Sequence, residues 1–334
     1  MSRMRDVQVV MKTVDPATPP LVSVVLPTYE RPRMLAEAVE SVAKQSYPNV
    51  ELLVVDDGSS TPASTVLDEC APAGLEWQCL RHEENRGANA ARNTGIRATA
   101  GDFVAFLDDD DRWMPETVAS QVTALRGAGE EAGVALVGQR TINGNDETAI
   151  RLPSVEGDAT AGLIAGEPAG TFSTMLVRRS LVEDAGLPDE RFPALQDREW
   201  MVRLSRHCTF VSVREPLVER RFGDYEQIDD AFEPKRDTTH PLFLEKHREL
   251  AAEYGCEPQF RAWLATTVAG TGLTNGYYSD ARRFALQAIR SNPRARRAYL
   301  YLVLALGGNV TYRPAVRFAR FTRSLQTKLG TKPA

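Results

Sequence analysis

The sequence has no long apolar run and little cysteine. No stretch of about 18 or more apolar residues, the length of a membrane-spanning helix, occurs in it. Residues 1–20, MSRMRDVQVVMKTVDPATPP, lack the uninterrupted apolar core of a signal peptide. Its four cysteines form no CxxC pair, which argues against a zinc site and against a disulfide framework. We therefore expect a protein that stays in the cytoplasm.

Two phosphate-binding motifs are also missing. The sequence contains neither GxGxxG nor GxxxxGK followed by Ser or Thr, so the dinucleotide-binding and P-loop classes are excluded. With 43% hydrophobic and 25% charged residues, the composition is that of an ordinary globular protein.

Acidic residues are absent from the C-terminal end of the chain. Residues 281–334 contain twelve Lys and Arg and no Asp or Glu, which leaves 28 of the 40 basic residues and all 45 acidic ones before them. Such a basic block suggests an anionic partner, which could be membrane lipid, nucleic acid or the acidic body of the protein itself. Nucleic acid is the least favoured of these, because no recognised nucleic-acid-binding module accompanies the charge.

Strands and helices alternate along the first part of the chain. Apolar, β-branched runs are separated by segments with helical spacing, which predicts βαβ units, a largely parallel sheet and an α/β fold. Polar clusters, PTYER, DDGSS, NRG and DDDD, follow the four predicted strands in turn. Because ligands of such sheets bind beyond the carboxyl ends of the strands, we expect these clusters to share one rim.

The four consecutive aspartates of FVAFLDDDDRW are the strongest chemical signal. Asp108 and Asp110, at the end of a predicted strand, can both reach a hard divalent cation such as Mg²⁺ or Mn²⁺. The alternatives for an isolated acidic run are a solvated turn or a cap for the helix predicted from about Pro115 to Arg126.

Five segments in a fixed order resemble the family 2 glycosyltransferases with the GT-A fold over residues 22–221. They are VSVVLPTYER, VELLVVDDGSS, NRGANAARNTGI, FVAFLDDDDRWMPE and LQDREWMVRL. The resemblance implies an inverting transferase that moves a sugar from a nucleotide-diphosphate donor, with a divalent cation, Mn²⁺ or Mg²⁺, on the pyrophosphate. It also implies a Rossmann-like mixed, mainly parallel sheet flanked by helices.

The resemblance suggests a division of the chain. Residues 1–20 would be a flexible leader and residues 21–224 the transferase domain, with a nucleotide-binding half at 21–114 and an acceptor half at 115–224. Residues 225–334 would form a helical C-terminal region with a basic tail. Within it, GYYSDARRFALQAIRSNPRARRAYLYLVLAL resembles one tetratricopeptide unit, too few for a solenoid.

Site residues carry over from the resemblance by matched position. Metal ligands would be Asp108, Asp110 and Asp111, and the general base would be Asp197, beside Gln196 where the family usually has Glu. Asp197 could alternatively, or in addition, cap the following helix. Contacts to the nucleotide sugar would come from Pro27, Thr28, Tyr29, Glu30, Asp56, Asp57, Arg86, Arg92, Asn93, Asp108 and Asp109.

The nucleotide-binding residues have simpler structural interpretations too. Asp56 or Asp57 would accept a hydrogen bond from the base, commonly uracil in this family, which favours a UDP-sugar. The same DDGS segment reads as a turn with Gly58 at positive φ and Ser59 capping the next helix. Arg86 and Arg92 could instead pair with Glu83 or Glu84 at the surface.

The acceptor is less well defined by the sequence. Processive synthases of the family carry Gln-x-x-Arg-Trp where this chain has Glu199 in place of the arginine, so single addition is favoured over polymerisation. We expect a glycan or polyprenyl-linked acceptor and a basic tail that could lie on the inner face of the cell membrane. The alternatives are a sugar nucleotidyltransferase, disfavoured because LPTYERPRM has no glycine, and a non-catalytic sugar-nucleotide-binding module.

Overall fold

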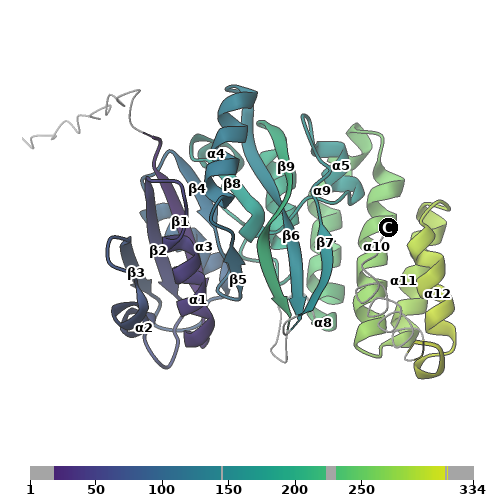
Figure 1. The fold of residues 1–334 in the computed structure, drawn as a ribbon. Coiled ribbons are helices and arrows are strands. Elements are labelled where there is room, and N and C mark those ends of the chain that lie inside the picture. Colours follow the sequence, from purple (N-terminus) through teal and green to yellow (C-terminus); the bar gives the residue numbers. More distant parts are fainter. Residues whose placement is uncertain (1–18, 144–145, 223–230, 313, 315–334) are drawn as a thin grey trace, which may run out of the picture.

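The computed structural model describes residues 19–143, 146–222, 231–312 and 314. Figure 1 shows an α/β domain followed by a group of helices at the C-terminal side. The elements of the first part are β1 (Val22–Thr28), α1 (Pro32–Ala43), β2 (Val50–Asp56), α2 (Ala63–Cys70), β3 (Glu76–Arg81), α3 (Ala88–Ala98) and β4 (Phe103–Phe106).

The acidic run and the second half of the sheet follow. Their elements are β5 (Asp111–Trp113), α4 (Thr117–Ala128), β6 (Ala132–Asn143), β7 (Asp146–Arg151), α5 (Thr160–Ala165), a 3-10 turn (Phe172–Thr174), β8 (Met175–Arg178), α6 (Ser180–Ala185), α7 (Gln196–Leu204) and β9 (Thr209–Phe222). The C-terminal part holds α8 (Phe232–Pro234), a π-helical turn (Lys235–Thr239), α9 (His240–Glu253), α10 (Glu257–Thr274), α11 (Tyr278–Ser291) and α12 (Arg296–Leu306).

The described strands form one mixed sheet in the order β3-β2-β1-β4-β8-β6-β9-β5, with β7 paired to β6. Strands β1 to β4 are mutually parallel, β8 is antiparallel to both of its neighbours, and β9 is again parallel to β6. Every residue of β1 is buried, as expected for a strand covered by helices on both faces. The expected mixed, mainly parallel α/β sheet flanked by helices is confirmed.

Two short elements were not predicted. Asp111–Trp113 forms a strand that pairs with β9, and the helix predicted from about Pro115 follows it as α4, which begins at Thr117. Residues Phe172–Thr174 form a 3-10 turn that precedes β8. Neither feature has a local signal, since a three-residue strand exists only through its partner, here from a segment about 100 residues later.

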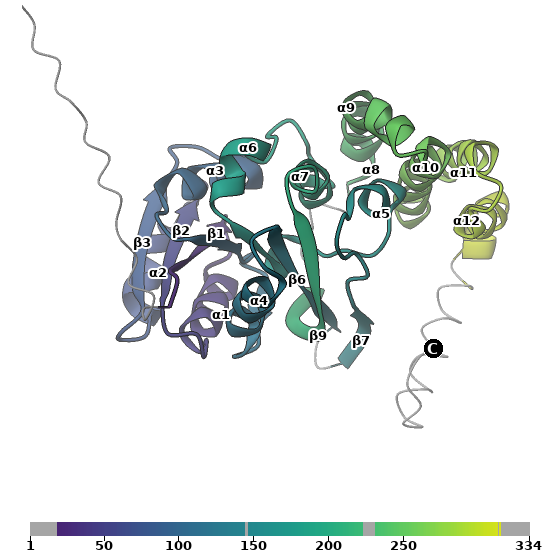
Figure 2. The ribbon, with the colours of Figure 1, turned by 90° about the horizontal axis from the view of Figure 1, so that it is seen from above.

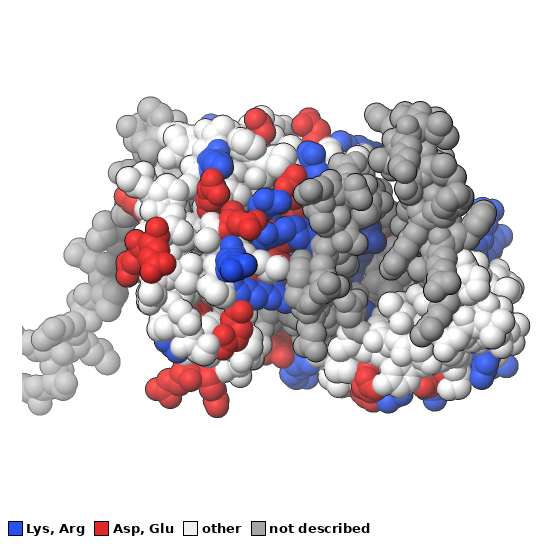
Figure 3. All heavy atoms as spheres, turned by 60° about the horizontal axis from the view of Figure 1, so that its bottom comes forward, with Lys and Arg blue, Asp and Glu red and all other residues white. Residues whose placement is uncertain are grey.

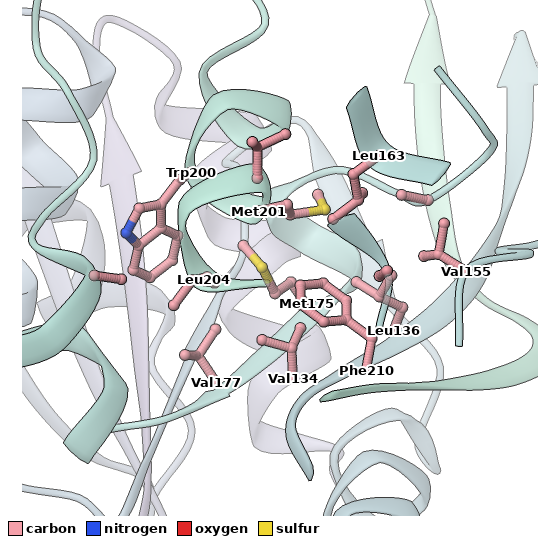
Figure 4. Close-up of a cluster of buried hydrophobic side chains, with 14 of the residues drawn as sticks. Val134, Leu136, Val155, Leu163, Met175, Val177, Trp200, Met201, Leu204 and Phe210 are labelled. Atoms are coloured by element: carbon pink, nitrogen blue, oxygen red, sulfur yellow. The ribbon is translucent and has the colours of Figure 1, made fainter. Parts of the chain in front are cut away.

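Helices cover both faces of the sheet, and each face has its own apolar core. Figure 2 shows α1 and α4 on one side and α3, α6 and α7 on the other. The second core lies on the face covered by α3, α6 and α7 and is enlarged in Figure 4. It packs Trp200, Met201 and Leu204 of α7 against Met175 and Val177 of β8. Full burial of these side chains contributes roughly 1.5–3 kcal/mol each, so α7 is firmly seated on the sheet.

The C-terminal helices attach to this second core. Phe243 of α9 with Phe260 and Leu264 of α10 belong to the same apolar cluster as Trp200, whereas α11 and α12 pack on α10 in a separate cluster. Among the described helices, none combines the length and apolarity that crossing a membrane requires. Helices α9 and α10 therefore extend the apolar core that α7 forms on the sheet.

Candidate active site

The carboxyl ends of the parallel strands bring the polar clusters to one edge of the sheet. Thr28 and Asp56 lie opposite each other in the register of β1 and β2, and the acidic run follows β4 on the other side of β1. Figure 3 turns the lower edge of Figure 1 forward, and acidic and basic side chains gather side by side there. The rim predicted from the strand ends is therefore present.

Three of the four aspartates converge. Oxygen atoms of Asp108, Asp110 and Asp111 lie within 4.8 Å of one another. Burial raises the pKa of Asp110 and, more strongly, that of Asp111, and repulsion within the cluster adds to both. The buried Asp111 Oδ1 has no hydrogen-bond partner among the described residues. Three carboxylates with an orphaned buried oxygen fit a hard divalent cation, whose charge would offset theirs.

Asp109 is different from its neighbours because it faces β1. Its carboxylate accepts hydrogen bonds from Thr28 Oγ1 at 2.8 Å and from the Arg31 guanidinium at 3.0 Å. Burial raises the pKa of Asp109 to about 6, against the opposing effects of Arg31 and Thr28. The side chain thus ties the acidic run to the end of β1.

Two arginines that the sequence did not single out hold the acidic run. Arg31 donates to Asp110 Oδ2 at 3.1 Å in addition to Asp109, and Arg221 of β9 donates to the Asp110 carbonyl oxygen at 2.8 Å. Arg31 is the final residue of the PTYER cluster, which was a usable signal. Arg221 comes from a strand more than 100 residues away, so only the pairing of β9 could reveal it.

Arg92 connects the acidic cluster to the helix of the proposed base. It is only 3% exposed, and its guanidinium donates to Asp108 at 2.5 Å, to Gln196 Oε1 at 3.0 Å and to Asn89 Oδ1 at 3.1 Å. Its guanidinium carbon also lies 4.0 Å from the centre of the Phe172 ring. Arg92 therefore does not pair with Glu83 or Glu84.

Asp197 is the second residue of α7, which begins at Gln196 rather than after Asp197. Its Oδ1 accepts from the Arg198 backbone N–H at 2.6 Å. The preceding Leu195 has φ +56°, an uncommon left-handed conformation for a branched side chain. The left-handed Leu195 ends the preceding loop, and α7 begins at the next residue, Gln196, whose side chain meets Arg92. The Gln196 amide also donates to the Phe192 carbonyl at 2.8 Å.

Glu199 lies two residues after Asp197 in α7 and is completely buried. It accepts hydrogen bonds from Arg203 Nε at 2.9 Å and interacts with Lys246 Nζ at 2.7 Å and His247 Nε2 at 3.3 Å. Burial acts to raise the pKa of Glu199, but the hydrogen bonds of these three groups lower it to about 2. Glu199, from which single addition was predicted, thus joins α7 to α9.

Asp56 and Asp57 both hold loops. Asp56 is fully buried and accepts from the backbone N–H groups of Ser59 and Ala63, so Asp56, and not Ser59, caps α2. Asp57 accepts from Arg86 N at 3.0 Å and from Gly87 N at 2.8 Å, and it contacts His82 Nδ1 at 2.6 Å.

The turn between these aspartates is as expected. Gly58 has φ +84°, and a Cβ atom there would lie 2.7 Å from the backbone of Glu84, so the residue must be glycine. Glu30, also at positive φ, accepts from the backbone N–H and hydroxyl of Ser60. The first and second strand-end loops are therefore bonded to each other.

The remaining predicted nucleotide contacts vary in position. Pro27 is buried within β1, and Tyr29 is 44% exposed at its end. Arg86 is half-exposed, with its nearest carboxylate that of Glu190 at 4.0 Å. Asn93 is buried and donates to the Pro188 carbonyl and to Glu190, so it anchors the loop before α7.

Comparison with known proteins places this site in a family. The family model described as "Glycosyl transferase family 2" matches residues 23–185. The uncharacterized glycosyltransferase RP339 of Rickettsia prowazekii is 30% identical over 276 residues, which cover 77% of this chain and 83% of the relative. The UDP-Glc:alpha-D-GlcNAc-diphosphoundecaprenol beta-1,3-glucosyltransferase WfgD of Escherichia coli is 36% identical over 105 residues, 31% of this chain and 41% of WfgD.

Solved structures share the fold. TarS 1–349 of S. aureus, in complex with UDP-GlcNAc, superposes with a TM-score of 0.59 at 18% identity and coverage of 94% and 93% of the two chains. The mannosyltransferase PcManGT from Pyrobaculum calidifontis, in complex with GDP-Man and Mn²⁺, gives 0.55 at 17% identity and coverage of 89% and 88%.

The chain spans less than half of several curated relatives, such as 43% and 38% of the glycosyltransferases from Rickettsia felis and Rickettsia bellii. The match to RP339 extends over most of both chains, and the family model covers the strands that carry the acidic rim. The chain therefore belongs to glycosyl transferase family 2 and has the GT-A type of fold.

Proposed function

We propose that this protein transfers one sugar, with inversion, from a nucleotide-diphosphate sugar to a lipid-linked or surface-glycan acceptor. The observation that carries this proposal is the bridge made by Arg92, which bonds to Asp108 of the acidic cluster and to Gln196 beside Asp197. One buried guanidinium thus links a carboxylate cluster suited to a metal to the first turn of the helix that carries a candidate base.

Asp108, Asp110 and Asp111 would hold Mn²⁺ or Mg²⁺. When bound, the cation would neutralise charge that accumulates on the departing diphosphate. The convergence of the three carboxylates and the orphaned Asp111 oxygen support this role. The solved relative PcManGT contains Mn²⁺ together with its nucleotide sugar.

Asp197 would accept the proton of the acceptor hydroxyl as that hydroxyl attacks the sugar. Inversion by a single displacement requires the base and the leaving group on opposite faces of the sugar. Asp197 and the acidic cluster come from different elements, α7 and the segment after β4, and Arg92 lies between them. That placement supports a single displacement.

A UDP-sugar is the favoured donor. The nucleoside would bind beside the loops formed by Thr28, Glu30, Asp56 and Asp57, which are already held in place by their own hydrogen bonds. Preformed loops lower the cost of ordering when the ligand binds. TarS, which shares the fold, was solved with UDP-GlcNAc.

We also propose that the C-terminal region rests on an anionic membrane. Apolar side chains on the outer face of α12 are strongly exposed, with Leu300 at 54%, Val303 at 60% and Leu306 at 65%. Arg296 at the start of the same helix is exposed, and no acidic residue follows position 280. Apolar and basic groups on one helix suit a lipid interface. The last part of the basic tail, residues 315–334, lies outside the described residues.

A donor screen tests the proposal. UDP- and GDP-sugars would be incubated with the full chain and Mn²⁺ or Mg²⁺, and hydrolysis or transfer would be followed with and without a chelator. Asp197→Asn should retain donor binding and lose transfer, whereas Asp184→Asn, an exposed aspartate on α6, should behave like wild type. Activity that survives chelation would refute the metal role, and unchanged transfer by Asp197→Asn would refute the base.

A further inference from the structure

The 3-10 turn Phe172–Thr174 is a buried segment that contacts the acidic run from 65 residues further along the chain. Its three side chains are at most 2% exposed. The Thr171 backbone N–H donates to Thr174 Oγ1 at 2.9 Å, and Gln121 Nε2 donates to the Thr174 carbonyl at 2.9 Å. A Cβ atom on Gly170 would collide with the Thr174 hydroxyl. The turn therefore provides a rigid support for the residues that it contacts.

The acidic run forms a turn of its own. The Asp111 backbone N–H donates to the Asp108 carbonyl at 3.0 Å, which brings the first and the last aspartate together. Carboxylate oxygens of Asp108, Asp110 and Asp111 lie within 4.8 Å of one another, and like charges at such distances repel. This repulsion favours opening of the turn, so neighbouring residues must hold it closed.

Ser173 bonds to both ends of the acidic turn. The Asp108 backbone N–H donates to Ser173 Oγ at 3.1 Å, which leaves the hydroxyl proton of Ser173 to be donated elsewhere. Burial raises the pKa of Asp111 strongly, and a hydrogen bond with the Ser173 side chain opposes that rise. The Ser173 carbonyl accepts from Trp113 Nε1 at 2.7 Å. One fully buried residue thus holds the start of the acidic run, its last carboxylate and the strand that follows.

Phe172, the residue before Ser173, supports the Arg92 bridge. The Arg92 guanidinium carbon lies 4.0 Å from the centre of the Phe172 ring, a distance at which the ring attracts the cation. The same ring packs against Trp200 of α7, with the ring centres 5.9 Å apart. Two neighbouring side chains therefore support the acidic cluster and the arginine that links this cluster to α7.

We propose that Ser173 is a positioning residue of the metal site, which keeps Asp108 and Asp111 in the arrangement that binds the cation. This inference rests on the proposed function and adds a residue to it. Ser173 is not itself a ligand here, since its buried hydroxyl already bonds to the acidic run. Removal of a partner that orients metal ligands typically weakens metal binding by about 10–100-fold. A serine with a purely structural role would change stability alone.

Mn²⁺ binding to the full chain tests the inference. The affinity is measured from the electron paramagnetic resonance signal of free Mn²⁺ with UDP present, because phosphate oxygens commonly complete such carboxylate sites. The variants are Ser173→Ala, which removes the hydroxyl, and Ser173→Cys, which keeps a side chain of similar shape but is a weak donor. Unfolding in urea is measured on the same proteins.

Ser205→Ala is the matched control. Ser205 is buried, and its hydroxyl also accepts one hydrogen bond, from Thr160 Oγ1 at 3.0 Å, and donates one, to the Val202 carbonyl at 3.0 Å. These partners belong to α5 and α7 and not to the acidic run. The control therefore removes a similar buried hydroxyl without touching the proposed ligands.

Both Ser173 variants should raise the Mn²⁺ dissociation constant at least about tenfold, whereas Ser205→Ala should leave it unchanged although its urea midpoint falls like that of Ser173→Ala. The Mn²⁺ concentration for half-maximal transfer should rise by the same factor, and the rate should return to that of wild type at saturating Mn²⁺. Unchanged affinity in the Ser173 variants, or an equal loss in Ser205→Ala, would overturn the inference. Wild type that binds no Mn²⁺ would instead overturn the metal role in the proposed function.

Discussion

The guanidinium of Arg92 and the carboxylate of Asp108 form a buried ion pair at 2.5 Å, in which the arginine is nearly inaccessible to solvent. The same guanidinium reaches Gln196 at 3.0 Å, so a residue of α3 links the end of β4 to the first turn of α7. The fork of the arginine allows both bonds at once, which a single ammonium group could not reproduce. One side chain thus bridges the spacing between the acidic run and the start of α7.

Arg92→Lys should disturb that spacing while it keeps the charge. We expect the transfer rate to fall by about 10–100-fold and the free energy of unfolding to fall by about 1–2 kcal/mol, because Gln196 or Asn89 loses a buried partner. Arg97→Lys, at an exposed position of the same helix, is the control. Kinetics with a saturating donor and denaturant unfolding measure the two effects, and a wild-type rate in Arg92→Lys would refute the linking role.

Glu199→Gln should loosen the attachment of α7 to α9. The substitution leaves Lys246 and Arg203 near a neutral partner in a buried place, and breaking such a pair costs about 3 kcal/mol. Because α7 carries Asp197, transfer should also fall while UDP binding remains. Glu183→Gln, an exposed position on α6, should leave both properties unchanged.

The pH dependence of stability should report the same network. The pKa of Glu199 is lowered to about 2 in the folded protein, below the ordinary value of 4.5. Its stabilisation is therefore complete above pH 4.5 and is lost as the pH falls toward 2. Urea unfolding between pH 3 and pH 6 measures the free energy of unfolding, which should fall less on acidification for Glu199→Gln than for wild type. An equal dependence of this free energy on pH in the two proteins would contradict the lowered pKa of Glu199.

His240 should destabilise the fold at mildly acidic pH. Burial, together with nearby Arg283, lowers the pKa of His240 to about 4 from 6.5, so the unfolded chain binds a proton there before the folded chain does. Stability should be unaffected above pH 6.5 and should fall by about 1–2 kcal/mol by pH 5. The His240 ring packs against Phe284 at 5.1 Å between ring centres. His240→Phe should keep an aromatic ring at this position but carry no titratable group, so it should remove this part of the loss of stability. Denaturant unfolding at pH 7 and pH 5 measures the difference.

The exposed face of α12 should bind vesicles. Full-length protein should sediment with vesicles of phosphatidylcholine and phosphatidylglycerol, less so with phosphatidylcholine alone, and binding should weaken with added salt. Leu300→Ser with Leu306→Ser should reduce binding about tenfold through lost apolar burial. Leu286→Ser, on the exposed side of α11, is the control, and an equal effect there would argue against a specific α12 contact.

The sequence alone was sufficient to predict the mainly parallel sheet, the family resemblance and the acidic rim. These depend on local patterns: β-branched runs such as VSVVLPT, helical spacing after them, and polar residues at each strand end. Because a parallel sheet collects its strand ends at one edge, residues far apart in sequence, such as Thr28 and Asp109, could be expected near each other. Which hydrogen bonds these residues form could not be predicted from the sequence.

Tertiary structure decided how each polar side chain is used. Asp109 faces Thr28 and not the cluster of Asp108, Asp110 and Asp111. Asp56 caps α2, and Glu199 is paired with residues of α9 almost fifty positions later. These outcomes depend on which donors a buried carboxylate meets, and the energy of leaving one unpaired makes that choice decisive. The packing of α11 and α12 on α10 in a cluster of their own likewise depends on contacts that no local pattern encodes.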